Sequence, residues 1–325
     1  MNDKIYPFLF IPVYKDYFWG GNRFKKYFNR KTSNKILAES WEISDRSEGM
    51  SIVENGVFSG KSLKEIILQF PSEIVGKNFK GSSFPLLIKI IDAKERLSLQ
   101  VHPDDLSAKK YGGEPKNELW HFLENDNSSI FYGLKNKIDK EHFLKNLQSN
   151  CIEDVLNKYS IKKDCNVLVP GGCIHAINSG SLILEIQQNS NTTYRIDDWN
   201  RLDINGNSRE LHINKALEVI NYNSINKPLL KTKIIKNNHL YTLIEIINGP
   251  YFKVEQINLK KYLLEEYDDS TFHALFVANG FVKIEWDENK SIEIKKGRSV
   301  LIPTASFKGI MERSPAFSSF AFSTV

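Results

Sequence analysis

The sequence has few cysteines and no long apolar run, and each shortage argues against a class of protein. Its 325 residues include three cysteines, Cys151, Cys165 and Cys173, an odd number without CxxC spacing. This usage argues against a disulfide framework or a thiolate zinc site and is typical of free thiols in a reducing compartment. No apolar run approaches the roughly 18 to 20 residues that cross a bilayer. The first residues show no apolar block followed by a small-residue cleavage site, so we expect a cytoplasmic protein that does not act at a membrane.

A strong excess of one charge is also missing. The 44 basic residues and 39 acidic residues leave a net charge of +5, and the basic residues are scattered. Residues 227–239 form the only modest basic cluster, which a solvated surface explains, so we expect no nucleic-acid partner. The sequence contains no P-loop, no GxGxxG before a helix and no nucleophile elbow. These absences argue against nucleotide binding and acyl transfer.

Most of the sequence consists of short strand-like runs separated by turn residues, which predicts a mainly β protein with a small helical segment. Ser62 and Glu65 have the spacing of a capping box, so a helix is expected to begin at Leu63. Residues 138–161 have the pattern of two short helices, and a further helix is expected from Arg209.

The length of the chain suggests two domains. We expect residues 1–228 to form a catalytic domain that includes the helical insertion at 138–161. Residues 229–325 contain strand patterns alone, separated by glycine turns, which suits a β-sandwich or jelly roll. This second part has no convincing set of polar residues at metal-ligand spacing, so we expect it to lack a metal site.

One strand carries an unusual polar face. In LSLQVHPDD, residues 97–105, apolar and polar residues alternate, so Ser98, Gln100 and His102 all point to the same side. That side either faces water, as in an ordinary half-buried strand, or lines a site that uses a hydroxyl, an amide and an imidazole together.

Further polar residues could join this face. Lys116 and Glu118 are again two positions apart, and His175 follows a small-residue turn. Together with Gln100 and His102, Glu118 and His175 make a mixed nitrogen and oxygen set that suits a divalent transition metal. Taken singly, each residue has a simpler explanation as a surface group, a turn residue or a strand carboxylate.

A second polar cluster lies at residues 184–201. Glu185 is either a paired structural carboxylate or a base for proton transfer. Arg195 and Arg201 have the planar forks that bind phosphate or carboxylate, although ordinary surface arginines would look the same.

Taken together, these segments resemble the type I phosphomannose isomerases, a family of zinc-dependent cupins, in their short bacterial form. The resemblance runs nearly the whole length of the chain and is carried by residues 12–24 (PVYKDYFWGGNRF), 38–53 (AESWEISDRSEGMSIV), 84–105 (FPLLIKIIDAKERLSLQVHPDD), 115–123 (PKNELWHFL), 169–201 (VPGGCIHAINSGSLILEIQQNSNTTYRIDDWNR) and 209–217 (RELHINKAL). One departure is DDWNR, where bacterial relatives usually read closer to YDWDR, so that Asn200 replaces an acidic residue.

The resemblance implies two cupin (jelly-roll) domains and one zinc ion per chain. It implies that zinc is held at the four positions that match the family motifs, Gln100, His102, Glu118 and His175. It also implies a sugar phosphate pocket whose substrate-binding residues are Trp19, Lys89, Ser98, Lys116 and Arg195, with Glu185 at a further matching pocket position.

The expected reaction interconverts mannose 6-phosphate and fructose 6-phosphate through a cis-enediol. It needs a base for the weakly acidic C2 proton and positive charge for the developing enediolate. We take Glu185 as the leading base, Lys116 as the group that relays or stabilises charge, and Arg195 as a contact of the enediolate or substrate. Ser98 and Arg195, with Lys89 in support, are expected at the phosphate.

Two other functions are compatible with such a pocket. A sugar-sensing cupin would keep the pocket and lose a ligand or the base, whereas every ligand position is filled here. Another metal cupin, such as an oxygenase or epimerase, would usually build its site from two or three histidines in one strand motif. We expect a small-molecule substrate as the only partner and a monomer or weak homodimer.

Overall fold

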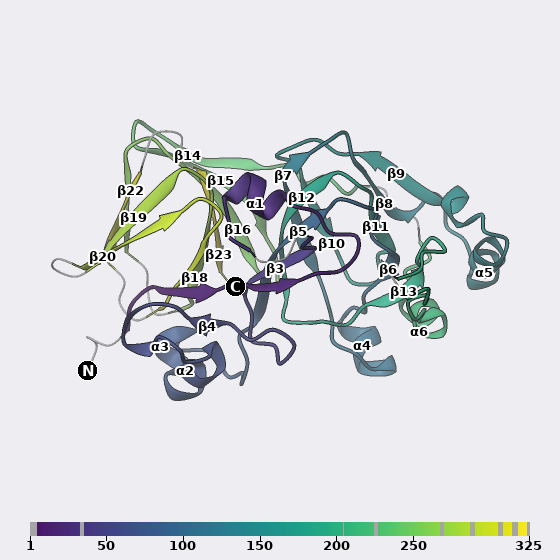
Figure 1. Cartoon of the computed structure of the whole chain (residues 1–325), viewed down its shortest axis with the longest axis horizontal. Coiled ribbons are helices and arrows are strands. Elements are labelled where there is room, and N and C mark those ends of the chain that lie inside the picture. The colour runs from purple at the N-terminus through teal and green to yellow at the C-terminus, as the bar shows by residue number, and fades with distance from the viewer. Residues whose placement is uncertain are drawn as a thin grey trace. The chain divides into compact units, whose positions relative to one another are not determined.

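The computed structural model describes residues 5–32, 36–203, 205–223, 227–266, 270–286, 290–304, 308–313 and 318–323. Contacts within the chain group into two compact units (Figure 1). The first comprises residues 1–13, 41–87 and 231–325, and the second comprises residues 14–40 and 88–230. Neither unit is therefore a continuous stretch of chain. The division into domains at 228/229 stays a prediction, although the last change of unit, at 230/231, lies close to it.

The first unit is built mainly from strands. Within its described residues, one sheet has eight strands in the order β14-β15-β16-β23-β18-β21-β1-β4, and another has four in the order β17-β22-β19-β20. The strands are β1 (Phe8–Ile11), β4 (Ile52–Val53), β14 (Lys233–Asn237), β15 (Tyr241–Asn248), β16 (Lys253–Leu259), β17 (Tyr262–Glu266), β18 (His273–Asn279), β19 (Phe281–Trp286), β20 (Lys290–Lys295), β21 (Ser299–Ile302), β22 (Lys308–Arg313) and β23 (Ser318–Ser323). Its helices are η2 (Gly56–Phe58), α2 (Leu63–Gln69) and α3 (Pro71–Ile74).

Helix α2 confirms the capping box expected from the sequence. The Ser62 hydroxyl accepts a hydrogen bond from the Glu65 backbone N–H at 3.2 Å, and the Glu65 carboxylate accepts from the Ser62 N–H at 2.8 Å. Leu63, Ile66 and Ile67 form the buried stripe. The helix begins at Leu63 as predicted, because two of the N–H groups that every helix start leaves unpaired are satisfied locally.

The second unit contains two further sheets and carries the polar residues of interest. One sheet has the order β10-β7-β12-β5-β3-β2, built mostly from this unit, and the other has the order β13-β6-β11-β8-β9. The strands are β2 (Val13–Lys15), β3 (Glu39–Ile43), β5 (Leu86–Ala93), β6 (Leu99–Val101), β7 (Glu118–Asn125), β8 (Ser129–Leu134), β9 (Leu156–Ser160), β10 (Asn166–Val169), β11 (His175–Ile177), β12 (Ser181–Gln188) and β13 (Tyr194–Asp197). The helices are α1 (Arg23–Phe28), α4 (Asp105–Tyr111), α5 (Lys140–Gln148), η3 (Ile152–Val155) and α6 (Ile213–Val219). The prediction of a mainly β fold is confirmed.

Two helix predictions were wrong in part. Of the two helices expected in residues 138–161, α5 is present, but the second is replaced by the single turn η3 and the strand β9. Strand β9 pairs with β8, so long-range ladder hydrogen bonds outweigh local helix preference. The helix expected from Arg209 begins only at Ile213, because the His212 N–H donates to the Arg195 carbonyl at 2.7 Å.

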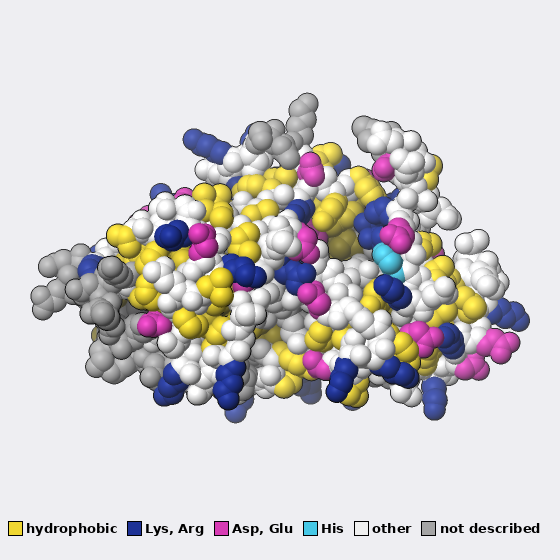
Figure 2. Space-filling view, turned by 90° about the horizontal axis from the view of Figure 1, so that it is seen from below, with side chains coloured by type: hydrophobic (Ala, Val, Ile, Leu, Met, Phe, Trp, Pro, Cys, Tyr) yellow, Lys and Arg dark blue, Asp and Glu magenta, His cyan; other side chains and the backbone are white. Residues whose placement is uncertain are grey.

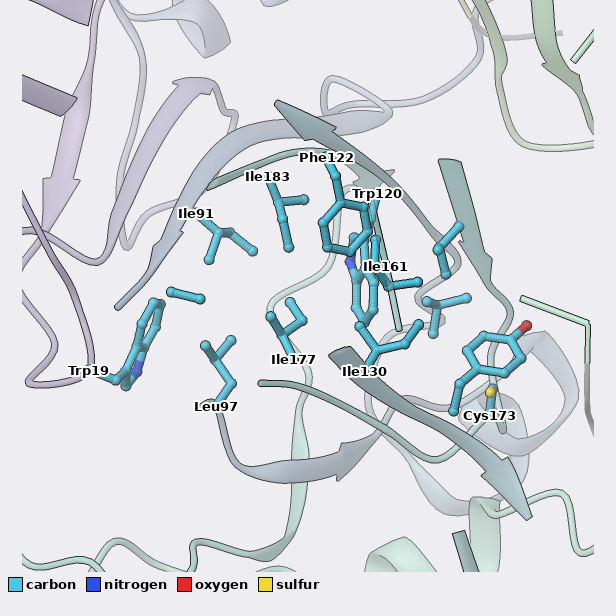
Figure 3. Close-up of a cluster of buried hydrophobic side chains, with 14 of the residues drawn as sticks. Trp19, Ile91, Leu97, Trp120, Phe122, Ile130, Ile161, Cys173, Ile177 and Ile183 are labelled. Carbon is cyan, nitrogen blue, oxygen red and sulfur yellow. The ribbon is translucent and has the colours of Figure 1, made fainter. Parts of the chain in front are cut away.

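The core of the second unit shows how one strand serves both packing and chemistry. Trp120 and Phe122 from β7 and Ile183 from β12 point into a shared apolar cluster (Figure 3). Since strand residues two apart share a face, Glu118 at the start of β7 is directed to the same side as Trp120. The packing that buries the tryptophan therefore also sets the direction of the carboxylate.

None of the helices in the described part of the chain has the length and apolar character needed to span a bilayer.

Candidate active site and metal centre

Strand register brings three distant residues into one row in the second unit. His175 on β11 lies opposite Gln100 on β6, and Arg195 on β13 lies opposite Gln100 on its other side. Residues directly opposite in an antiparallel pair project to the same face of the sheet. The polar face expected on residues 98–102 therefore points inward: Ser98 is buried, and Ser98 and Gln100 both line a cavity.

A histidine–glutamate–histidine cluster lies at the buried end of this face. The ligand-type atoms of His102, Glu118 and His175 all lie within 4.8 Å of one another, and each residue is about 1% exposed. The Nε2 atom of His102 is 3.2 Å from Glu118 Oε1, and the Nε2 atom of His175 is 3.9 Å from Glu118 Oε2. His102 directly follows β6, whereas Glu118 begins β7 and His175 begins β11.

The outer ring nitrogens of both histidines are held by backbone carbonyls. His102 Nδ1 is 2.8 Å from the Thr192 carbonyl, and His175 Nδ1 is 2.9 Å from the Cys173 carbonyl. Each Nδ1 must carry the proton it donates, so each Nε2 presents a lone pair toward Glu118. Burial lowers the pKa of His102 to about 3 and also lowers that of His175, so both rings are neutral at pH 7, as metal ligands must be.

Glu118 supplies the observation that tests for a metal ion. Its Oε1 atom accepts from the Lys116 ammonium at 2.7 Å, whereas its Oε2 atom is buried without a hydrogen-bond partner among the described residues. Burial raises the pKa of Glu118, but Lys116, His102 and His175 together lower it well below its usual range. A buried carboxylate that lies beside two imidazole lone pairs, with one of its oxygens unpartnered, is costly unless a cation completes the group.

Gln100 can complete the donor set. Its amide nitrogen is 3.2 Å from His175 Nε2, and the Ser98 hydroxyl donates to its amide oxygen at 3.2 Å. Turning the amide by 180° exchanges these two atoms and presents the oxygen to the cluster. Two imidazole nitrogens and two oxygens fit a divalent transition metal, so the residues present suit the ion that the sequence predicts.

A cavity of about 310 Å³ opens beside the cluster. Its volume is within the range of small-molecule sites, which begins at about 300 Å³. All of the predicted pocket residues contribute to its wall. The residues that line the cavity are Tyr17, Trp19, Glu39, Lys89, Ile91, Leu97, Ser98, Gln100, Lys116, Glu118, Trp120, Ile177, Glu185, Asn191, Thr193, Arg195 and Arg209.

Glu185 occupies a buried position with two firm contacts. Trp120 Nε1 donates to its Oε2 atom at 2.9 Å, and the Lys89 ammonium is 3.0 Å from its Oε1 atom. Burial, and then the negative charge of Glu118, raise the pKa of Glu185 to about 6. Lys89 also lies 3.7 Å from Glu39. Although burial opposes it, these carboxylates raise the pKa of Lys89 above its usual value.

Arg201, a candidate from the sequence, and the neighbouring histidine of β7, His121, both lie outside this constellation. His121 is on the opposite face of β7 from Glu118, where its Nδ1 atom is 2.9 Å from the Asn166 side-chain oxygen. Arg201 does not line the 310 Å³ cavity, and its guanidinium contacts Asp198 and the Arg96 carbonyl instead.

Sequence reasoning missed several residues of the cavity wall. Tyr17 belongs to the same motif as Trp19, so that motif was the available signal, and Glu39 stands in the second matching motif. Arg209 is far from Arg195 along the chain, and only the hydrogen bonds between residues 209–212 and β13 bring it to the cavity.

Comparisons with known proteins agree with this geometry. The model of the family described as phosphomannose isomerase type I, catalytic domain, matches residues 8–131. A mannose-6-phosphate isomerase of Streptococcus mutans serotype c is 37% identical over 238 residues, which cover 73% of each chain. The mannose-6-phosphate isomerase ManA of Bacillus subtilis is 35% identical over 257 residues, which cover 78% of this chain and 79% of the relative. A crystal structure of the mannose 6-phosphate isomerase from Bacillus subtilis superposes with a TM-score of 0.89 at 30% identity, over 97% of this chain and 99% of that one.

Proposed function

The chain belongs to the type I phosphomannose isomerases, so its reaction is the interconversion of mannose 6-phosphate and fructose 6-phosphate, and we propose how its residues carry this out. The observation that supports the proposal is a cavity whose wall holds Glu118 of the histidine–glutamate–histidine cluster, a second buried carboxylate and four cationic side chains. An aldose–ketose isomerase needs these groups and no organic cofactor.

One zinc ion per chain is the cofactor that we propose, held by Gln100, His102, Glu118 and His175. The unpartnered Glu118 Oε2 atom and the two inward Nε2 lone pairs support this set. A bound zinc ion supplies a fixed positive charge beside the sugar oxygens and holds the pocket in one arrangement. The ligand residues keep the ion in place through the backbone carbonyls that orient both imidazoles.

Glu185 is the base in this proposal. The reaction moves a proton from C2 of the aldose to C1 of the ketose, and a hydroxyl proton passes between the two oxygens. A carboxylate with a pKa near 6 is ionised at pH 7 and still basic enough to take the C2 proton and return it to C1. The Trp120 N–H and Lys89 hold the carboxylate in one orientation.

Lys116 and Arg195 provide positive charge for the enediolate and the substrate. Lys116 is buried between Glu118 and the cavity, so its charge acts in a low dielectric, where it stabilises a developing oxyanion more than it would in water. Trp19 offers an apolar wall, and Ser98, Lys89 and Arg195 are the phosphate contacts taken from the sequence. The phosphate supplies binding free energy away from the reacting carbons, which orients the sugar.

A coupled assay that follows conversion of mannose 6-phosphate, with and without a chelator, tests this function. We expect turnover that chelator abolishes and that zinc restores in proportion to about one bound ion per chain. A sugar-sensing protein would bind the sugar phosphate without turnover, and another metal cupin enzyme would leave mannose 6-phosphate unchanged. Either result would contradict the proposal.

The oligomeric state of the protein and its cellular compartment are also part of the proposal. We keep the expectation of a monomer or weak homodimer, which light scattering across a range of protein concentrations tests directly. The three cysteines are free thiols, and this supports a reducing cytoplasm as the site of action.

A further inference from the structure

Two arginines bind one buried carboxylate beside the cavity. Asp198 is 6% exposed and accepts hydrogen bonds from the guanidinium groups of both Arg201 and Arg209. Both guanidinium groups also lie over the Phe18 ring, at 4.9 Å and 5.1 Å from its centre. Figure 2 shows Lys and Arg side chains gathered with a histidine and acidic side chains at the rim of a hollow on one face of the molecule.

Arg201 and Arg209 differ in whether a guanidinium nitrogen remains without a hydrogen bond. Arg201 uses Nε for the Asp198 carbonyl, Nη1 for the Arg96 carbonyl and Nη2 for the Asp198 carboxylate, so all three of its nitrogens are occupied. Arg209 uses Nε and Nη2 for the Asp198 carboxylate, and within the described ranges its Nη1 atom has no hydrogen bond. Arg209 also lines the 310 Å³ cavity, whereas Arg201 does not.

Arg195 is held next to Arg209 by the backbone. Its Nη1 atom donates to the Glu210 carbonyl at 2.7 Å, and its main chain exchanges hydrogen bonds with His212. The Arg195 Nε atom is buried and has no hydrogen-bond partner among the described residues. Two neighbouring guanidinium groups thus each keep an N–H donor that none of the described residues accepts.

The loop that carries Asp198 is conformationally costly. Trp199 and Asn200 have φ angles of 59° and 54°, which place two consecutive non-glycine residues in the left-handed region. Such conformations persist only where the surrounding structure determines them, and they are common at functional sites. Here they hold the carboxylate that orients Arg209.

Charge is unevenly distributed along the cavity. Arg195 and Arg209 line the cavity at this end, and the buried carboxylate there, Asp198, pairs with Arg209 and Arg201. At the other end, the Lys89 and Lys116 ammonium groups already pair with the carboxylates of Glu39, Glu118 and Glu185. The arginine end therefore attracts a phosphate dianion most strongly, and Lys89, which already faces two carboxylates, can only support it.

We propose that Arg209, oriented by Asp198, is a second phosphate-binding arginine that acts with Arg195 on the 6-phosphate of the substrate. This inference rests on the proposed function, because it names the group that the same cavity would bind at its arginine end. Arg209 is a substrate-binding residue in this account, and Asp198 is a positioning residue.

Arg209→Gln and Arg201→Gln form a matched pair for the test. Each removes one guanidinium from Asp198 and from the Phe18 ring, but only Arg209 lines the cavity. Losing a charge-assisted contact should raise the KM of Arg209→Gln for mannose 6-phosphate by about 10- to 100-fold, with kcat changed far less. The inhibition constant of inorganic phosphate should rise by a similar factor, and Arg209→Lys should recover part of both losses. Arg201→Gln should change either quantity by less than about threefold.

Equal KM values for Arg209→Gln and the wild type would overturn the inference, as would an equal rise in Arg201→Gln. Melting temperatures of all variants show whether each is folded, and Arg209→Lys keeps the test valid if Arg209→Gln is not. Calorimetric binding of inorganic phosphate to the wild type and to Arg209→Gln does not require turnover. If the wild type fails to isomerise mannose 6-phosphate, the proposed function fails, while a weaker phosphate affinity in Arg209→Gln still supports this site.

Discussion

Replacing Trp120 with Phe isolates the role of Glu185 with the smallest change in packing. The indole N–H donates to Glu185 Oε2 at 2.9 Å, and both side chains are at most 2% exposed. A hydrogen bond to a charged group contributes about 1.5 to 3 kcal/mol, and the variant leaves this buried carboxylate oxygen without it. The ionised form of Glu185 is then disfavoured relative to the protonated form.

The expected readout is the pH dependence of kcat. A pKa change of one unit corresponds to about 1.36 kcal/mol, so the acidic limb of the profile should move up by about one to two pH units. Glu185 must be ionised to accept the C2 proton, so activity falls as pH drops through its pKa, which is about 6 without a metal ion. A bound dication lowers that value, and the comparison is therefore between variant and wild type at equal zinc content.

Tyr132→Phe is the matched control. It removes a buried aromatic donor from the same apolar cluster, but the Tyr132 hydroxyl donates to the Leu168 carbonyl at 2.8 Å and not to Glu185. Both variants should lose stability, but only Trp120→Phe should move the acidic limb. If the acidic limb of the kcat profile stays at the wild-type pH in a folded, zinc-loaded Trp120→Phe enzyme, Glu185 is not the base.

Three other variants test separate parts of the structure. Glu185→Gln should retain zinc and lose about 100-fold or more in turnover, whereas near-normal activity would remove it as the base. His102→Ala should lose bound zinc by elemental analysis, while His121→Ala, on the opposite face of β7, should keep it; equal zinc content in both would contradict the ligand set. Ser62→Ala should lower the free energy of unfolding by about 1 kcal/mol in urea titrations because the capping box is lost. Ser59→Ala, whose hydroxyl makes one exposed hydrogen bond, should cost less, and the reverse order would contradict the capping argument.

Local features of the sequence predicted local structure well. The start of α2 at Leu63 depends on Ser62 and Glu65, which are close in the chain, so spacing alone was enough. The direction of Glu118 also follows from strand periodicity on β7. By contrast, the second helix expected near residue 155 is replaced by β9, because a partner strand offers hydrogen bonds that no local pattern reveals.

The departure at Asn200 shows what a motif comparison leaves open. By sequence it removes an acidic group from a family position. In the structure the residue has a φ angle of 54°, a left-handed conformation that asparagine adopts more readily than most residues. Asparagine therefore suits the backbone conformation that this position has in the loop that carries Asp198.

The sequence by itself determined the kinds of chemical groups and their direction on each strand, because alternation and capping act over a few residues. Only the tertiary structure decided which groups meet, since strand register and loop contacts join residues that are distant in the chain. Register placed His175 beside Gln100, and a bridge between residues 209–212 and β13 placed Arg209 in the cavity wall while leaving Arg201 outside it.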